Sequence, residues 1–442
     1  DRRTFLKMSL TTTATIPARK NGLRASYAST HRDAIEPAIS RSTFATRKLA
    51  ADEKYWNTIR AEFPIMENIL YLNNGTMGPS PRQVTDRVTD RIRHVDATGD
   101  YSGDYEAIRT ALAHLVNAES GDQIAFTHNV SEAISIVSSG IELKAGDEVI
   151  LTDQEHAGNA VPWLTRKKRD GIEIKFASIT NGASGGFAPY SDDEILHSVE
   201  QTISSRTRAI CVPHLTCTTG QLLPIKRIAE LARSRGIWMI ADGAHPPGML
   251  MTDVRDLGVH AYASCGHKWL CGPKGIGFLY IAPDFLEHVI PTWSGAEADQ
   301  YWGYDAKLDF LPTASRYDFA TQNFGLFDGL QCAIEFMQTI GLDHVQSRVQ
   351  YLTGLLRSGL HELSAGKFRF LTPETSLTGV TTIKLDTMDY KDFANKMMAK
   401  CKARTRVVPE GNLQANRFSV HIYTSPEDIG KFLDGAKAVL AL

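Results

Sequence analysis

The stretch IWMIADGAHPPGMLMTDVRDLGVHAYASCGHKWLCGPKGIGFLY, residues 237–280, decides the fold. It opens with an apolar run that ends in Asp242, and Lys268 follows 26 residues later (268 minus 242). A turn signal, Gly272-Pro273-Lys274-Gly275, then leads into a second apolar run. The first run predicts a buried strand that delivers a carboxylate, and the turn delivers an amine. Taken singly, the acid is as readily a cap and the lysine a solvated surface residue.

Length and composition bound the rest. The chain has 442 residues, of which 43% are hydrophobic and 22% charged, with a formal net charge of -2. These values are typical of a soluble globular protein of two domains. The charge predicts no nucleic-acid partner, and no apolar run reaches the roughly 20 residues that a membrane span needs. The six cysteines contain no CxxC pair, which predicts no metal site.

The amino terminus bears on location. Residues 1–7, DRRTFLK, resemble the twin-arginine export signature, and a short apolar stretch follows. Residues 1–48 are therefore expected to be a signal and linker, with a periplasmic destination. The alternative is an accidental basic start on a cytoplasmic protein.

Strand and helix patterns alternate through the middle of the chain. Strands are expected at 124–127, 148–152, 172–177, 208–213 and 237–241, and helices at 105–117, 131–139, 192–203 and 225–235. This alternation predicts an α/β fold with a mostly parallel sheet covered by helices. Polar residues follow four of the strands, and ligands bind such sheets at the carboxyl ends of strands. We expect these strand ends to form one crevice.

Two domains are expected. The large one spans 49–325, and its first segment, 49–71, either belongs to it or packs on the small domain. A helical pattern begins near 54 and is ended by Pro64, and an aromatic, acidic insertion occupies 293–310. The small C-terminal α+β domain spans 326–442. Helical patterns cover 324–340, 344–363 and 390–400, and strands are expected at 368–371, 378–385, 404–408 and 418–423.

Two loops are candidates for binding. Residues 127–131 lead into a helix whose cap is Asn129 or Ser131, and free N–H groups at a helix N-terminus make a phosphate site. A simple capped helix is the alternative. The loop 71–81, with two glycines, two prolines and two asparagines, is either functional or a domain-entry turn.

Asp242 and Lys268 together suit pyridoxal 5′-phosphate (PLP). That cofactor needs a lysine to hold its aldehyde as a Schiff base, and a carboxylate to keep its ring nitrogen protonated. Asp242-Gly-Ala-His245, Gly266-His267-Lys268-Trp269-Leu270, the turn at 272–275, Gln154-Glu155-His156 and the segment RFSVHIY at 417–423 follow in this family's order. On these motifs the chain resembles the class V aminotransferase superfamily of PLP fold type I, from about residue 60 onward.

The resemblance implies a role for each matching residue. The three catalytic residues would be Lys268, which forms the Schiff base and moves protons, Asp242, which pairs with the pyridinium nitrogen, and His156, which stacks on the ring. His245 would lie near the phenolic oxygen. Further cofactor-binding residues would be Asn129, Val130, Ser131 and His267 around the phosphate, and Thr321, which would reach the phosphate of a neighbouring subunit. Arg417 would anchor the substrate α-carboxylate, and Asn74 is assigned to the substrate side.

That assignment implies a homodimer with the active site at the subunit interface. Desulfurases of the superfamily carry a nucleophilic cysteine shortly before the arginine, but residues 407–416 contain none. Cys265 and Cys217 replace residues that relatives use near the cofactor, and HKWLCGPKG is closer to the epimerase-like branch. These departures point away from persulfide chemistry.

We therefore expect a PLP-dependent enzyme that acts at Cα of an amino-acid or peptide-like substrate through an external aldimine, most simply as an aminotransferase. Epimerase and C–S or β-lyase chemistry are alternatives, and a noncatalytic PLP-fold binding protein is the alternative of another class. With the export signal, the chain also resembles periplasmic PLP enzymes that tailor the glutamyl end of the siderophore pyoverdine.

Overall fold

The computed structural model describes residues 48–181, 188–364 and 366–441. The signal and linker expected at 1–48 lie outside this part, apart from Lys48. No helix of the described residues is both long enough and apolar enough to cross a bilayer.

A seven-stranded sheet organises the larger part of the chain. Its order is β2-β8-β7-β6-β5-β3-β4. Its strands are β2 (Ile124–Thr127), β3 (Glu148–Thr152), β4 (Glu173–Ala177), β5 (Thr207–Pro213), β6 (Trp238–Asp242), β7 (Ala261–Cys265) and β8 (Gly277–Ile281). The strand β8 is antiparallel to its two neighbours, β2 and β7, and the other pairs of neighbouring strands are parallel. The expected mostly parallel sheet is therefore confirmed. The strand β7 was not expected, because AYASC is only weakly apolar, although all five residues are buried.

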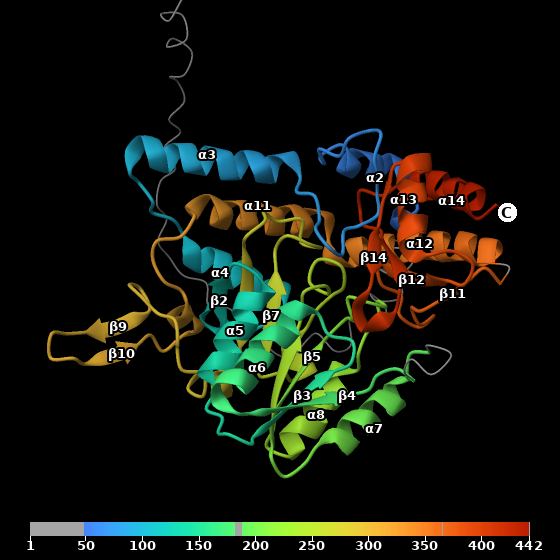
Figure 1. The fold of residues 1–442 in the computed structure, drawn as a ribbon. Helices are drawn as coiled ribbons and strands as arrows, with labels where there is room; N and C mark the ends of the chain where they lie inside the picture. The colour runs from blue at the N-terminus through green and yellow to red at the C-terminus, as the bar shows by residue number, and fades with distance from the viewer. Residues whose placement is uncertain (1–47, 182–187, 365, 442) are drawn as a thin grey trace, which may run out of the picture. The chain divides into compact units, whose positions relative to one another are not determined.

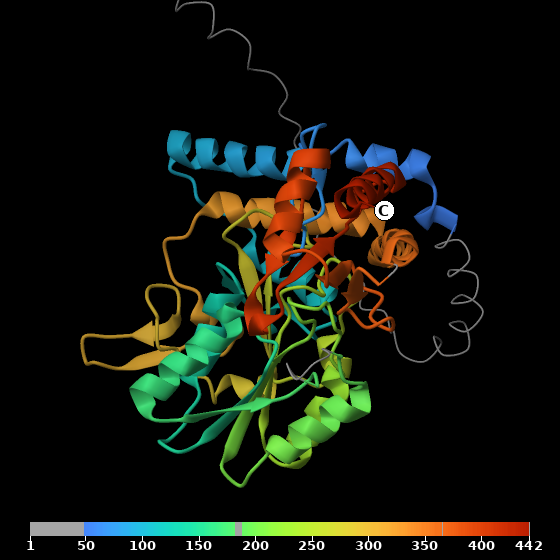
Figure 2. The same ribbon diagram turned by 45° about the vertical axis from the view of Figure 1, so that its right-hand side comes forward.

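Helices cover the sheet, as Figure 1 shows. They include α4 (Tyr105–Leu115), α5 (Val130–Gly140), α6 (Ala157–Asp170), α7 (Asp192–Thr202) and α8 (Ile225–Ser234). Strands β2 and β3 are buried along their whole length, and each fully buried Leu, Ile or Val contributes about 1.5–3 kcal/mol. The helix α3 (Arg82–Thr98) lies along α11 (Phe324–Ile340) in both views (Figures 1 and 2). The sequence did not predict α3, because only Val84 of its seventeen residues is buried.

A four-stranded antiparallel sheet of order β11-β12-β15-β14 forms a second core. Its strands are β11 (Phe368–Phe370), β12 (Val380–Leu385), β14 (Arg406–Val408) and β15 (Ala415–Ser419), and α12 (Leu342–Ser364), α13 (Tyr390–Cys401) and α14 (Pro426–Leu440) pack with them. The strand expected at 418–423 lies earlier in the chain, because β15 begins at Ala415 and only residues 418 and 419 of the expected range belong to it. The ladder ends at Ser419, and a turn closes when Thr424 N–H donates to the carbonyl of His421.

The expected domain boundary at 325/326 stays a prediction. Leu330 and Ile334 of α11 lie in the same apolar cluster as the seven-stranded sheet. Leu70 and Leu72 instead pack in the cluster of the four-stranded sheet, and β1 (Leu70–Tyr71) pairs in parallel with β13 (Ala403–Arg404).

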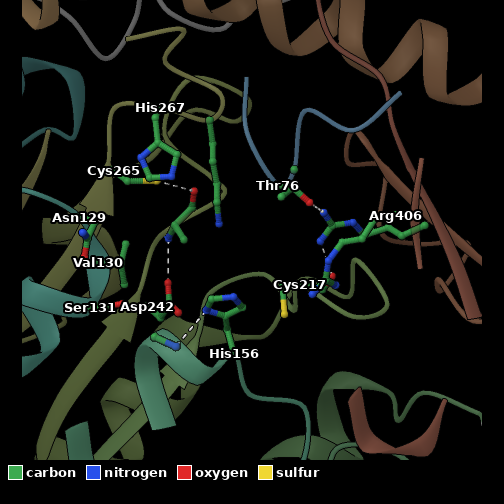
Figure 3. A pocket seen from close by; sticks show the side chains of 15 residues that line it. Thr76, Asn129, Val130, Ser131, His156, Cys217, Asp242, Cys265, His267 and Arg406 are labelled. Carbon is green, nitrogen blue, oxygen red and sulfur yellow. Dashed lines mark hydrogen bonds between the residues drawn. The ribbon is translucent and has the colours of Figure 1, made fainter. Parts of the chain in front are cut away.

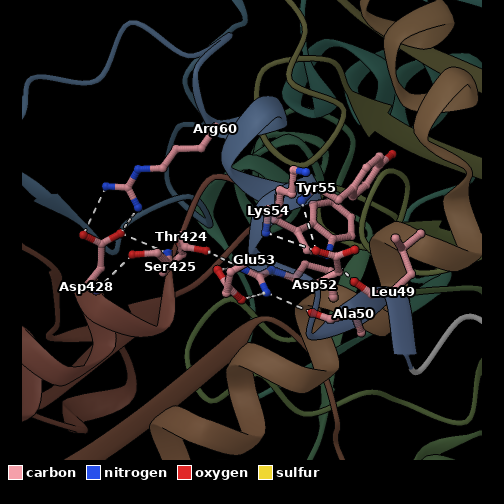
Figure 4. A network of polar contacts seen from close by, with 12 residues as sticks. Leu49, Ala50, Asp52, Glu53, Lys54, Tyr55, Arg60, Thr424, Ser425 and Asp428 are labelled. Atoms are coloured by element: carbon pink, nitrogen blue, oxygen red, sulfur yellow. Dashed lines mark hydrogen bonds and ion pairs between the residues drawn. The ribbon is translucent and has the colours of Figure 1, made fainter.

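The segment before β1 is tied down by polar contacts (Figure 4). The helix α2 (Glu53–Arg60) ends four residues before Pro64, where the sequence had placed its end. Arg60 forms an ion pair with Asp428 of α14. The buried Arg348 of α12 donates to the Glu53 carboxylate and, at 2.9 Å, to the carbonyl of Ala50. These contacts join α2 to the helices of the second core.

The expected insertion at 293–310 contains a hairpin, β9 (Asp299–Trp302) and β10 (Leu308–Phe310), which extends away from the sheet (Figure 1). The side chains of Trp293, Trp302 and Tyr304 are exposed on it. The short helices α9 (Val254–Leu257) and α10 (Pro283–Leu286) complete the connections on either side of β7 and β8.

Candidate active site

A cavity of about 300 Å³ opens at the carboxyl ends of β2, β6 and β7 (Figure 3). Its lining comes from both sheets and from the loop before α3. The lining residues are Gly75, Thr76, Asn129, Val130, Ser131, His156, Gly158, Cys217, Asp242, Ala244, Cys265, His267, Lys268, Arg406 and Arg417.

Two sides of this cavity carry different functional groups: one has the lysine amine and the Asp242 carboxylate, and the other has two arginine guanidinium groups. We call Asn129, Val130, Ser131, Asp242 and Lys268 the lysine wall, since all five follow or end strands of the large sheet. We call Thr76, Cys217, Arg406 and Arg417 the arginine wall. In Figure 3 Asn129 and Val130 lie on one side of the cavity, and Thr76 and Arg406 lie on the other.

Lys268 sits in the turn between β7 and β8. The loop after β1 packs directly on this turn, where Gly78 N–H donates to the carbonyl of His267 at 2.8 Å. A Cβ at Gly78 would lie 2.1 Å from the carbonyl oxygen of Lys268, so only glycine fits there. Gly78 of the 71–81 loop therefore serves the close approach of two backbones at the lysine, whereas Gly75 lies against the side chains of Ser419 and Arg417.

Asp242 ends β6 and is buried, with 5% of its surface exposed. Its Oδ1 accepts a hydrogen bond from Ala244 N–H at 2.9 Å. The intervening Gly243 is required, because a Cβ there would lie 1.9 Å from the Tyr262 ring. The turn thus orients one carboxylate oxygen and leaves the acid lining the cavity.

His245 is held as one tautomer. The indole Nε1–H of Trp269 donates to His245 Nδ1 at 3.1 Å, and an indole can only donate, so Nδ1 carries a lone pair. Burial, and then the charge of Lys268, keeps the His245 pKa well below its usual value. The ring is therefore neutral with its proton on Nε2, which lies 3.4 Å from Lys268 Nζ.

The N-terminus of α5 borders the cavity beneath Asn129, Val130 and Ser131. The Asn129 side chain caps the helix by accepting from Glu132 N–H at 3.2 Å, and N–H groups of the first turn lack intrahelical partners. His267 adds a buried Nδ1 without a partner. Burial and the charges of Lys268 and Lys274 lower the His267 pKa to about 4. This corner offers unpaired groups to an anion.

His156 is the N-cap residue of α6, at the edge of the lysine wall. Its Nδ1 accepts from Gly158 N–H at 3.0 Å, and burial, followed by the charge of Lys268, lowers its pKa. The preceding Glu155 is half-buried, and desolvation raises its pKa to about 8. Glu155 accepts from Thr152 and Asn159, which fixes the turn that presents His156.

Arg417 anchors the arginine wall with only 1% of its surface exposed. Its Nη1 donates to the Cys217 carbonyl at 2.6 Å and its Nη2 to Thr76 Oγ1 at 2.8 Å, while Nε has no partner. Burial, and then the charge of Arg406, lowers the Arg417 pKa to about 9. A buried cation of this kind is stabilised by a ligand carboxylate.

The structure brings together most of the residues that the sequence indicated. Asn129, Val130, Ser131, His156, Asp242, His267, Lys268 and Arg417 line the cavity, and His245 touches Lys268. Asn74 lies just behind Gly75, buried, and accepts from the Tyr423 hydroxyl at 3.0 Å. Thr321 is not in this group: it lines a second cavity of about 270 Å³ with Tyr105, Phe319 and other aromatic residues.

Sequence reasoning missed Thr76, Arg406 and the tautomer role of Trp269. Thr76 lay in the loop already singled out, one residue after Gly75. Arg406 gave no signal, because its place opposite Arg417 depends on strand register.

The fold and this site define a PLP-dependent enzyme of fold type I. A family model described as aminotransferase class-V matches residues 71–432, and the chain belongs to that family. It is 27% identical over 412 residues to isopenicillin N epimerase of Streptomyces clavuligerus, covering 87% of this chain and 98% of that one. It is 30% identical over 325 residues to a probable cysteine desulfurase of Halalkalibacterium halodurans, covering 69% and 77%.

A solved structure extends the likeness. A mutant of C-DES, a cystine C–S lyase, with glycine covalently linked to the PLP cofactor matches with a TM-score of 0.77 and 25% identity. The match covers 85% of this chain and 98% of that one. PLP is the cofactor of this chain, as expected from Asp242 and Lys268. The cavity suits it: an amine, a buried acid and an anion corner with an unpaired His267 Nδ1 meet in one space.

Proposed function

We propose that the chain is an aminotransferase that acts at Cα of an amino acid. The observation that carries this proposal is the pairing of Lys268 with Arg417 across one cavity. Lys268 is the one lysine among the described residues lining it, and Arg417 offers a planar donor set for an α-carboxylate. An amine at one wall and a carboxylate anchor at the other suit an α-amino acid.

The lysine wall would hold the cofactor. Lys268 would bind its aldehyde carbon, and Asp242 would accept from its ring N–H. The N-terminus of α5 and His267 would bind its phosphate, with His156 beside the ring and His245 at the phenolic oxygen. When bound, PLP supplies the electron sink that stabilises negative charge developing at Cα.

Side chains of the protein would then transfer the Cα proton of the substrate. Lys268 Nζ, once released, would take the proton from Cα and return it to another atom on the same face. His245 presents Nε2–H toward Nζ, a donor that favours the unprotonated amine next to it. Arg417 and Thr76 would fix the carboxylate, so that Cα–H points toward Lys268.

Persulfide formation lacks a nucleophile here. No cysteine follows Cys401 in the sequence. Cys217 and Cys265 line the cavity, but burial raises the pKa of both thiols, that of Cys265 to about 11. Protonated thiols are poor nucleophiles, so amino-group chemistry is favoured over sulfur transfer.

Epimerisation is a second candidate, supported by the relative named isopenicillin N epimerase. It needs a proton donor on the substrate face away from Lys268, and the Cys217 thiol of the arginine wall is available for that role. Cys217→Ser would then slow racemisation while Lys268 still exchanges the Cα hydrogen with retention, whereas transamination would be little affected.

One experiment separates these outcomes. The holoenzyme is incubated in D₂O with a panel of L-amino acids, and keto acid, Cα deuterium and racemisation are measured. Keto acid, formed with conversion of the cofactor to its amine form, is expected for transamination. Exchange with racemisation and without keto acid would instead establish epimerisation, and sulfide or pyruvate from cysteine would establish elimination.

Assembly and location are further proposals. Thr321 lies away from the chain's own cavity, which is consistent with a homodimer in which it serves the partner; light scattering on the purified protein tests this. Residues 1–7 support twin-arginine export to the periplasm. Replacing Arg2 and Arg3 by lysine should block export, and unchanged export would contradict the proposal.

A further inference from the structure

The loop after β5, residues 214–220, joins the two sheets beside the cavity. Every residue of this loop is buried. Gly220 N–H donates to the Thr216 carbonyl at 3.0 Å, and the hydroxyl groups of Thr216 and Thr219 are hydrogen-bonded at 2.8 Å. These contacts within the loop favour a single conformation.

Two consecutive carbonyls of this loop accept hydrogen bonds from the four-stranded sheet. The Cys217 carbonyl accepts from Arg417 Nη1 at 2.6 Å, and the Thr218 carbonyl accepts from Thr382 Oγ1 at 2.8 Å. Thr382 of β12 is the direct cross-strand partner of Arg417 on β15. Directly opposed residues of an antiparallel pair point to the same face of their sheet. The Thr382 hydroxyl therefore holds the loop next to the place where Arg417 binds it.

The Thr218 side chain extends this connection to the large sheet. Its hydroxyl donates to Gln154 Oε1 at 2.9 Å, and both residues are buried. Gln154 follows β3 and lies two residues before His156, which lines the cavity. A chain of hydrogen bonds therefore runs from the turn that presents His156, through Thr218, to Thr382 beside Arg417.

The proposed reaction depends on the separation of Lys268 and Arg417. Lys268 follows β7 and Arg417 lies on β15, and these two strands pack in different apolar clusters. A shift of one sheet against the other would change that separation, and a misplacement of about 1 Å can lower a rate roughly 10²-fold. A buried connection beside Arg417 opposes such a shift.

We propose that Thr218 and Thr382 are positioning residues for substrate binding: they hold the Cys217 carbonyl, and with it Arg417, at a fixed separation from Lys268. Neither threonine is among the residues that line the cavity, so both act through Arg417 and not on the ligand. This inference rests on the proposed function, since it takes Arg417 as the anchor of the α-carboxylate.

The test measures binding of 2-aminoisobutyrate to the holoenzyme. This amino acid has an α-amine and an α-carboxylate but no hydrogen at Cα, so the change in cofactor absorption during a titration reports binding without proton transfer. If only an L-amino acid of the panel binds, its KM takes the place of the dissociation constant. Thr382→Val removes the hydroxyl at nearly the same volume and should weaken binding about tenfold, as should Thr218→Val. The absorption of the ligand-free holoenzyme should stay that of the wild type.

Two further variants separate positioning from stability. Thr382→Ser keeps the hydroxyl and should retain the wild-type affinity. Thr353→Val is the matched control, because Thr353 of α12 is equally buried and its Oγ1 donates to the Thr378 carbonyl at 2.9 Å, away from the residues that line the cavity. Its unfolding in denaturant should show a similar loss of stability, and its affinity for 2-aminoisobutyrate should be unchanged.

A double-mutant cycle shows whether Thr382 acts through Arg417. Arg417→Lys keeps the positive charge but has a single flexible ammonium group, which does not depend on the exact place of the Cys217 carbonyl. In that background Thr382→Val should weaken binding by less than about twofold, because two residues that act through one contact are not additive. Equal factors in both backgrounds would overturn the proposal.

The remaining outcomes separate the positioning role from the proposed function. Wild-type affinity in Thr382→Val and Thr218→Val, or an equal loss in Thr353→Val or Thr382→Ser, overturns the positioning role and leaves Arg417 as the anchor. If Thr382→Val does not fold, Thr218→Val takes its place in the cycle. If no amino acid changes the cofactor absorption of the wild type, or if Arg417→Ala binds as tightly as the wild type, the proposed function itself fails.

Discussion

The two walls of the cavity are built in different ways. The lysine wall is fixed by backbone geometry: Ala244 N–H holds Asp242, and Gly78 packs on the carbonyl of Lys268. The arginine wall is fixed by side chains that cross between elements, with Arg417 held by Thr76 and the Cys217 carbonyl. It also keeps unpaired buried atoms on Arg406 and Arg417.

On the proposed function, this difference matches the two ligands: the lysine wall would hold the cofactor and the arginine wall the substrate. A wall held by backbone contacts keeps the same conformation whichever ligand enters the cavity, and this suits a permanently bound group. A wall with unpaired polar atoms is completed by its ligand, which suits selection among substrates. Substitutions in the lysine wall should therefore alter cofactor spectra and catalysis, and substitutions in the arginine wall should alter affinity.

The largest expected effect is at Lys268. Lys268→Ala removes the attachment point and the proton-moving amine together, and activity should fall about 10³–10⁴-fold, near the upper range for loss of a general acid–base group. The absorption of lysine-bound PLP should vanish. Lys274→Ala removes a neighbouring lysine that bonds Ser80 instead, and it should keep that absorption. Persistence of the band in Lys268→Ala would refute the assignment.

The sequence predicted the lysine wall better than the arginine wall for a physical reason. Asp242, His245 and Lys268 belong to short contiguous motifs at strand ends, where local pattern and parallel-sheet rules are sufficient. Arg406 reaches the cavity only through its register with Arg417 on the neighbouring strand. The polar helix α3 and the small-residue strand β7 were missed because tertiary contacts, and not periodicity, stabilise them.

Buried neutral histidines behind the lysine wall predict a pH limit on stability. His421 Nε2–H donates to the Trp269 carbonyl at 2.9 Å, and burial lowers the His421 pKa from 6.5 to about 4. The unfolded state then binds more protons between these values, so stability is complete above pH 6.5 and falls as pH decreases toward 4. This one group should account for about 3 kcal/mol.

Denaturant unfolding of the apoprotein across that pH range measures the effect. His421→Gln keeps a donor for the Trp269 carbonyl but cannot titrate. The slope of its unfolding free energy against pH should therefore be smaller than that of the wild type by the amount that corresponds to about one bound proton. His197→Gln, on the exposed face of α7, is the control and should match the wild type. Identical slopes for wild type and His421→Gln would contradict a buried neutral imidazole.

A substitution in the arginine wall should lower the affinity for the substrate. Arg417→Lys keeps the charge but loses the planar pair of donors, and KM for the amino acid should rise about 30–100-fold, as expected for a charge-assisted contact worth 2–3 kcal/mol. The kcat and the cofactor spectrum should change little. A fall in kcat at unchanged KM would move Arg417 from binding to chemistry and remove the distinction between the walls.

The smallest effect tests the contact between Trp269 and His245, beside Lys268. Trp269→Phe removes the indole N–H that keeps a lone pair on His245 Nδ1. The proton is then free to occupy either nitrogen, and only part of the molecules present Nε2–H to Lys268. We expect about a tenfold loss of kcat, equivalent to roughly 1.4 kcal/mol, with KM unchanged.

Packing loss alone could also lower activity, so a second readout is needed. The pH titration of the lysine-bound PLP absorption should shift in Trp269→Phe, because it reports on the groups that surround Lys268 Nζ. Trp163→Phe alters another fully buried tryptophan, which lies on α6, and it should lose similar stability without that shift. Equal titrations in both variants would reduce Trp269 to a packing residue, and the His245 proton would then be set by the cofactor instead of by the chain.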